Sequence, residues 1–366
     1  MSTKIKKLVT ALALGGGVLV ASGASAFDLT GIGFVQYGDA QSYSLPISNL
    51  QVGEANNPGS SFYVNSTPGA IQDLIVVATG SSGTGVTTNF AGMDDAYATP
   101  SGKNGSAFFQ TGGVVSPDPN GAGEFTGDQA NTWDTTLAAL QTFLGGESMV
   151  FFFNNNQVNS GASTNQNLAA WAQVTITNDL GEIIATFDFT NNGGKYAIVS
   201  EGGGGVFMGD VTTYDSTGAG PTGDASGTPT DYVLSGGAIC LDTDTTPPTP
   251  VSCSNGSADT GPINHNLGAN QAAYAMTAPE LDALLADLFD DGLDLTQYAM
   301  HIDLRLGCDP TLFSGDACIG KSLNNGYEQL FIGTATTTTN VPEPNIAALF
   351  GIGVLALVGL TRRRRC

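Results

Sequence analysis

The C-terminal end of the chain carries an uncharged apolar stretch, Ile346 to Leu360, which constrains the fold more than any other feature. In a bilayer, a single segment of this kind satisfies its backbone polar groups only as a helix. Fifteen residues at about 1.5 Å each reach roughly 23 Å, against a hydrocarbon core of about 30 Å. The side chains of the arginines that follow can extend to the membrane surface and so compensate for the short helix. Their positive charge keeps the C-terminal end of the helix on the cytoplasmic side. A globular fold is therefore expected before Val341, on the outer side of the membrane.

The apolar stretch stands between a turn sequence and a basic cluster. Val341, Pro342, Glu343 and Pro344 precede it, and Arg362, Arg363, Arg364 and Arg365 follow it. These three parts, in this order over residues 341–366, resemble the PEP-CTERM sorting signal of exported bacterial proteins. The resemblance implies a transient inner-membrane helix at 346–360, recognition by an exosortase and cleavage near the Pro-Glu-Pro turn. The alternative is a plain C-terminal membrane anchor.

The N-terminus predicts a cleaved signal peptide over residues 1–26. Lys4, Lys6 and Lys7 precede an apolar region, and Ala24-Ser25-Ala26 has the small-residue pattern that signal peptidase cuts. Cleavage after Ala26 would make Phe27 the first residue of the exported chain. An uncleaved anchor is the alternative.

The exported part is expected to be strongly acidic. The chain has 33 Asp and Glu against 11 Lys and Arg, and three of the lysines and four of the arginines lie in the two signals. Four basic residues then remain, and no acidic residue lies before Phe27 or after Pro344, which gives the part up to Pro344 a formal net charge of 4 − 33 = −29. Such a surface has no cationic patch to displace counterions from phosphates, and this argues against nucleic acid and against anionic lipid headgroups as partners.

Residues 27–333 are predicted to be mainly β, in a β-sandwich or jelly roll. The 50 glycines and many β-branched residues favour short strands joined by tight turns. Ser148 to Phe153 predicts a buried strand that ends where Asn154-Asn155-Asn156 turns back into solvent. Residues 168–177 and 182–189 predict a β-hairpin, because their alternating patterns flank a turn.

Two short helices are expected in this region. The first runs from Thr132, as N-cap, to Leu144, and glycines follow it. The second runs from Thr277 to Asp291, with Thr277 and Glu280 as a capping box and an apolar stripe opposite a polar face that includes Asp282.

Two features bear on how the exported region is divided. Residues 240–253 include a proline-rich stretch, which fits either a domain boundary or a loop. Residues 334–340 are rich in threonine and are expected to form a spacer before the sorting signal.

Four cysteines remain after the tail is removed: Cys240, Cys253, Cys308 and Cys318. An even number in an exported protein predicts two disulfides, and we favour the local pairs Cys240–Cys253 and Cys308–Cys318. Zinc is the alternative, but the cysteines and histidines lack the usual ligand spacing.

Evidence for a catalytic or metal site is weak. Neither histidine is predicted to be catalytic. His265 is expected in a turn-rich loop, and His301 is expected on a half-exposed polar face of a strand. Four acids near Gly292 form a weak calcium candidate that departs from the EF-hand pattern. These acids are Asp287, Asp290, Asp291 and Asp294. We therefore expect no enzyme and no required cofactor.

The sequence thus predicts a protein exported across the inner membrane to the cell surface or extracellular matrix. Signal peptidase and an exosortase would process it, and exopolysaccharide is its expected partner. A structural or adhesive role in the biofilm follows from the family resemblance. The alternatives are an extracellular polysaccharide hydrolase and a carbohydrate- or calcium-binding module.

Overall fold

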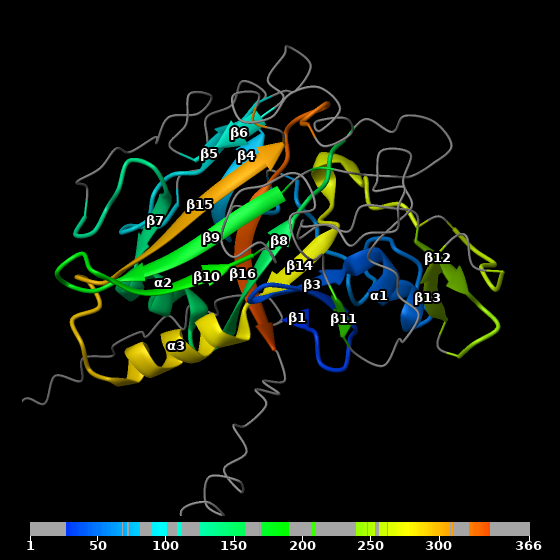
Figure 1. The fold of residues 1–366 in the computed structure, drawn as a ribbon, viewed down its shortest axis with the longest axis horizontal. Helices are drawn as coiled ribbons and strands as arrows, with labels where there is room; N and C mark the ends of the chain where they lie inside the picture. The colour runs from blue at the N-terminus through cyan, green and yellow to red at the C-terminus, as the bar shows by residue number, and fades with distance from the viewer. Residues whose placement is uncertain are drawn as a thin grey trace, which may run out of the picture.

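In a computed structural model, the described part of the protein is mainly β, with three short α-helices (Figure 1). This confirms the predicted class. The structure describes residues 27–80, 89–100, 108–111, 125–157, 168–189, 206–208, 239–252, 256–307, 309 and 322–336, except positions 68, 72, 169, 247 and 262. Within these ranges no helix is both long and apolar enough to cross a membrane. The span expected at 346–360 lies outside them.

The larger sheet has nine strands and is centred on the apolar segment that the sequence marks as buried. That segment is β8 (Ser148–Phe153), which lies between β14 (Tyr274–Thr277) and β16 (Leu330–Thr336). The sheet order is β11-β2-β3-β14-β8-β16-β4-β5, and β1 also pairs with β16. The remaining strands are β1 (Phe27–Asp28), β2 (Phe34–Tyr37), β3 (Ala40–Ser44), β4 (Ile75–Gly80), β5 (Tyr97–Thr99) and β11 (Val206–Met208).

The second sheet has five strands and contains the predicted hairpin. β9 (Ala170–Thr177) and β10 (Ile183–Asp188) pair antiparallel, which confirms that prediction. Along its length β9 also pairs with β15 (Ala299–Gly307), and β15 pairs in turn with β6 (Phe108–Gln110) and β7 (Trp133–Thr136).

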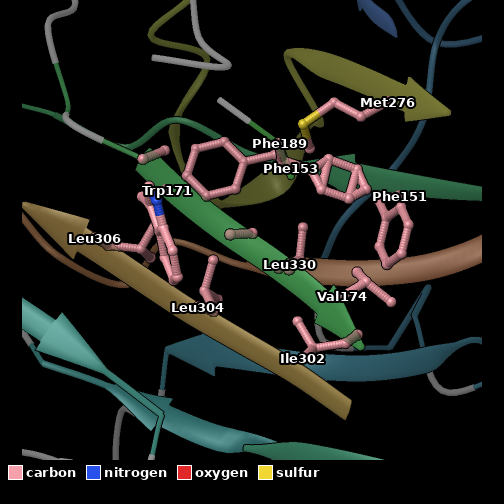
Figure 2. Close-up of a pocket in the computed structure, with 12 residues that line it drawn as sticks. Phe151, Phe153, Trp171, Val174, Phe189, Met276, Ile302, Leu304, Leu306 and Leu330 are labelled. Carbon is pink, nitrogen blue, oxygen red and sulfur yellow. The ribbon is translucent and has the colours of Figure 1, made fainter. Parts of the chain in front are cut away.

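The two sheets share one hydrophobic core. Figure 1 shows β9 and β15 crossing in front of β8 and β16, and Figure 2 shows the side chains that meet between them. Phe151 and Phe153 come from the larger sheet, and Val174 and Ile302 come from the smaller one. A separate cluster that includes Val150 and Phe152 covers the other face of the larger sheet. β8 is apolar without alternation because both of its faces are buried.

The helices differ from the prediction at their N-termini. Residues 133–136 form β7, and α2 (Leu137–Leu144) begins only after Thr136, whose side chain accepts from Ala139 N–H. Similarly, Thr277 ends β14, and α3 (Pro279–Asp290) has Ala278 as its N-cap with no side-chain bond, so the predicted capping box is wrong. Strand pairing holds residues 133–136 extended in the first case and Thr277 extended in the second, so neither predicted helix start forms.

A third helix, α1 (Leu45–Gln51), was not predicted. Ser44 caps it and Pro46 lies in its first turn, a combination that favours a helix start. The helix has only seven residues, so its sequence is too short to show the apolar periodicity from which a helix is predicted.

The proline-rich stretch forms a two-stranded sheet of β12 (Ile239–Asp242) and β13 (Thr249–Ser252). Leu241 packs with Ile47 and Ile263, so this hairpin contacts α1 through a small apolar cluster of its own. At the other end of the chain, β16 continues through Thr336. The first three residues of the predicted spacer therefore belong to the sheet.

Candidate functional site

The residues predicted to direct sorting and processing lie outside the described part of the chain. They are Ala24, Ala26, Val341, Pro342, Glu343, Pro344 and Arg362 to Arg365. The structure does place the residues that border them. β1 begins at Phe27 and pairs in parallel with the end of β16, so Phe27 lies opposite Ala335. The two ends of the folded body are therefore neighbours on one sheet.

Cys240 is disulfide-bonded. It is buried in β12, and Gly261 makes room for it, because a Cβ at Gly261 would lie 2.7 Å from the Cys240 Sγ atom. Cys253, Cys308 and Cys318 lie outside the described residues, so the pairing itself stays a prediction.

The calcium candidate is not assembled. Asp287, Asp290, Asp291 and Asp294 are all exposed, and no three of their carboxylates come within 4.8 Å of one another. The Asp294 side chain instead accepts from the Thr296 N–H and hydroxyl groups in a local turn. The described residues bring two other sets of acids that close: Asp94, Asp128 and Asp134, and the more exposed Asp242, Asp244 and Asp259.

The first of these sets includes Asp134, which contacts a buried histidine. His301 is 2% exposed, so the half-exposed strand face predicted for it is wrong. Its Nδ1 atom lies 2.9 Å from Asp134 Oδ1, and its Nε2 atom lies 2.9 Å from the Thr177 hydroxyl. Asp94 Oδ2 accepts from the Asp134 N–H at 2.9 Å. The loop before β7 and the pairing of β7 and β9 with β15 cover the imidazole.

This Asp–His–Thr arrangement has the donors and acceptors of a catalytic triad, but it is closed to a substrate. Asp134 and Thr177 are 0% and 1% exposed, so a substrate atom cannot reach the hydroxyl group. The three carboxylates have the ligand chemistry of a hard cation such as Ca²⁺. The hydrogen bonds of His301 to Asp134 and to Thr177 also join β15 to β7 and β9, and we assign the cluster that structural role. No sequence signal marked Asp134, since its partner lies 167 residues away.

His265 is likewise buried and structural. Its Nε2 atom lies 2.7 Å from the Ser44 hydroxyl, its Nδ1 atom lies 3.2 Å from the Ile263 carbonyl, and its ring stacks on Tyr274. Burial lowers the pKa of His265 to about 4, because the charged imidazolium would lose its hydration. The neutral ring thus connects the loop before β14 to the start of α1.

A cavity of about 510 Å³ lies between α2, α3 and the turn that leads into β8. It combines acidic, amide and apolar side chains with the two glycines that end α2. The lining residues are Gln141, Leu144, Gly145, Gly146, Glu147, Ser148, Asp282, Leu285, Ala286, Phe289 and Asp290. Those from α3 follow one helical stripe, and this spacing is a signal that the sequence interpretation overlooked.

Asp282 is the most perturbed acid of this cavity. Its Oδ1 atom accepts from Met149 N–H at 3.1 Å, whereas its Oδ2 atom is buried and receives no hydrogen bond. Burial raises the pKa of Asp282 to about 7, and the Met149 N–H offsets only part of the shift. The polar helix face predicted for Asp282 is therefore wrong, because β8 packs against it.

A second buried carboxyl group lies where β8 ends and β16 begins. The antiparallel register continues past them, since Asn154 N–H donates to the Gln329 carbonyl at 3.1 Å. Asn154 and Asn155 are fully buried, so the predicted turn into solvent is wrong. Glu328 lies opposite Asn155 in this register, is fully buried, and receives no hydrogen bond from another residue at either oxygen. Burial raises its pKa to about 8.

These features define a mainly β protein whose two larger sheets share a core and whose polar clusters are largely buried. Residues 27–305 match the family described as a domain of unknown function, DUF8239, and the chain belongs to this family. Searches of curated proteins and of solved structures found no match.

Proposed function

We propose that this chain is an exosortase-sorted protein of the PEP-CTERM type, exported to the cell surface or extracellular matrix. There it takes a structural or adhesive role in the exopolysaccharide layer. Its two sheets form a sandwich of jelly-roll character. Signal peptidase and the exosortase process it at its two ends, and the apolar tail anchors it in the inner membrane only until cleavage.

The observation that carries the proposal is the position of the two ends of the body. Phe27, the expected first residue of the exported chain, is already part of β1, and its ring packs on Phe62 and Phe152 with centroids 5.6 and 5.3 Å away. β16 ends at Thr336, five residues before Val341. A complete two-sheet body therefore fits between the two expected cleavage sites, and removing both signals leaves its core intact.

Two further observations support export. Cys240 is disulfide-bonded, and disulfides persist in oxidising compartments. The excess of acidic residues in the body keeps separate copies soluble and apart outside the cell.

The test is to change Pro342-Glu343-Pro344 to alanines in the producing bacterium. We expect a larger form that stays in the membrane fraction, because the exosortase no longer cuts it. Alanines at Thr337-Thr338-Thr339 serve as the matched control and should leave processing unchanged. If the Pro-Glu-Pro variant has the size and location of the native protein, the sorting proposal is wrong and a plain anchor is favoured.

The cavity between α2 and α3 favours a second candidate, a carbohydrate-binding module. Its volume falls within the range of small-ligand pockets, roughly 300–1,000 Å³. Binding of purified exopolysaccharide without release of reducing ends would support this candidate, and release of reducing ends would favour a hydrolase.

A further inference from the structure

The buried Asp–His–Thr arrangement has a fourth member, the side chain of Gln129. The amide nitrogen of Gln129 lies 3.4 Å from the Nε2 atom of His301. The Thr177 hydroxyl group lies 2.9 Å from the same ring nitrogen. A hydroxyl group and a carboxamide group from distant parts of the chain therefore meet at one imidazole nitrogen. In acyl transfer, such a nitrogen takes the proton of the attacking hydroxyl group and gives it to the departing amine.

The imidazole ring is oriented for this task. The carboxylate of Asp134 accepts from His301 Nδ1 at 2.9 Å, so the lone pair of Nε2 is left to accept the Thr177 hydroxyl proton. The Thr132 hydroxyl group also donates to Asp134 Oδ1, at 2.5 Å. β15 lies between β7 and β9, and this strand order brings the three groups together (Figure 1).

The loop before β7 holds Gln129 next to the hydroxyl group. The Gln129 N–H donates to Asp134 Oδ2, so the backbone of the loop is fixed at the same carboxylate. Gly127 has a φ of +88°, and a Cβ atom there would lie 2.9 Å from the Cβ of Ala299 and 3.8 Å from Thr177 Oγ1. A side chain at Gly127 would therefore force the loop away from Thr177.

Burial decides which acyl group can react. Thr177 and His301 are 1% and 2% exposed, so the amide that reaches them has to belong to the chain itself. Gln129 is exposed as a residue, which leaves its side chain room to turn its amide carbon to the hydroxyl group and gives ammonia a way out. Water normally releases the acyl group from such a nucleophile, and its exclusion makes the acylated threonine the end product.

We propose that Thr177 and Gln129 join in an ester crosslink that the protein forms by itself. Thr177 Oγ1 attacks Gln129 Cδ, and the hydroxyl proton passes to His301 Nε2. The bond between Cδ and the amide nitrogen of Gln129 then breaks, and His301 gives the proton to that nitrogen. One C–O bond forms, one C–N bond breaks and one molecule of ammonia leaves, with no change in oxidation state. His301 is the catalytic residue of this step, and Asp134 is a positioning residue.

The experiment is mass spectrometry of the full chain, purified in detergent after reduction of its disulfides. The crosslink lowers the mass by about 17 Da, the mass of ammonia. A protease that cuts before aspartate places Gln129 in residues 128–133 and Thr177 in residues 134–178. We expect these two peptides to stay joined, and to separate when hydroxylamine is added to the digest, because hydroxylamine cleaves esters and leaves amides intact.

Substitutions assign the two ends of the bond. Gln129→Ala changes an exposed residue, so the fold should survive and the loss of mass should disappear. Thr177→Val should also abolish the loss, and Thr177→Ser should restore it because serine keeps the hydroxyl group. Thr175→Val is the matched control, since it removes a hydroxyl group from the same strand and should leave the crosslink unchanged. Asp134→Asn should lower the crosslinked fraction of chains that are folded by circular dichroism.

Three results would overturn the proposal. The first is a native chain of full mass whose two peptides separate without hydroxylamine. The second is a crosslink that persists in Gln129→Ala or resists hydroxylamine, because the bond then joins other groups. The third is a crosslink lost in Thr175→Val as fully as in Thr177→Val. The proposal goes beyond the matrix role and does not depend on it, so the Pro-Glu-Pro test and this one can fail separately.

Discussion

Replacing Glu328 with glutamine should remove a large pH dependence of stability. The side chain is fully buried where β8 ends and β16 begins, and neither carboxyl oxygen receives a hydrogen bond from another residue. The ionised form would therefore be buried without compensation. Burial raises the pKa of Glu328 from 4.5 to about 8. The folded protein then keeps a proton that the unfolded chain releases.

The sign and size of the effect follow from this difference in pKa. Below pH 4.5 the carboxyl group is neutral in both states and has no effect on the free energy of unfolding. As the pH rises towards 8 the unfolded chain ionises first, so the folded state loses stability. At 1.36 kcal/mol for each pKa unit, the full loss is about 5 kcal/mol, of which about 3 kcal/mol has occurred by pH 7. Glutamine cannot ionise, so the variant avoids this loss.

Urea unfolding between pH 4 and pH 8 measures the effect. Glu328→Gln should match the native protein near pH 4 and become more stable than it as the pH rises. Asp287→Asn is the control for removing one negative charge, because Asp287 is exposed on α3. If the free energies of unfolding of the native protein and of Glu328→Gln differ by the same amount at every pH in this range, Glu328 is not a buried neutral acid and the reasoning fails.

Two further predictions concern the core and the low-pH limit. His265 has a pKa lowered from 6.5 to about 4, so its contribution is present above pH 6.5 and is lost as the pH falls towards 4, by about 3 kcal/mol. In the His265→Gln variant the free energy of unfolding should change less with pH over that interval. An unchanged pH dependence would contradict the assignment. Phe153→Ala removes a side chain that is 1% exposed between the two sheets, and it should cost about 3–5 kcal/mol in urea unfolding. Ile184→Ala, on the exposed edge strand β10, should stay within about 0.5 kcal/mol, and similar costs for both would contradict the shared core.

The sequence interpretation succeeded where the pattern was local and long. β8, the β9–β10 hairpin and the body of α3 were all predicted, because their apolar patterns indicate locally which residues are buried. It failed at element boundaries. Thr132 and Thr277 were good N-cap candidates by residue type, but β7 pairs through the residues that follow Thr132, and β14 includes Thr277 itself.

The polar sites were the larger failure. Asp134, Asp282 and Glu328 were not predicted to be buried, because no residue close to them in the chain marks them. Asp134 meets His301 across 167 residues, and Asp282 meets Met149 across 133. Such contacts depend on which strands become neighbours in a sheet. The local patterns of a single sequence do not specify this strand order.

The sequence by itself determined the secondary-structure class, the main buried strand and the expected processing signals, because each depends on residues close together in the chain. Only the tertiary structure decided which acids and histidines are buried, and it brought Phe27 beside Ala335 in one sheet. The physical reason is that burial of a polar group depends on the surfaces packed against it. Here those surfaces come from strands and helices more than a hundred residues apart.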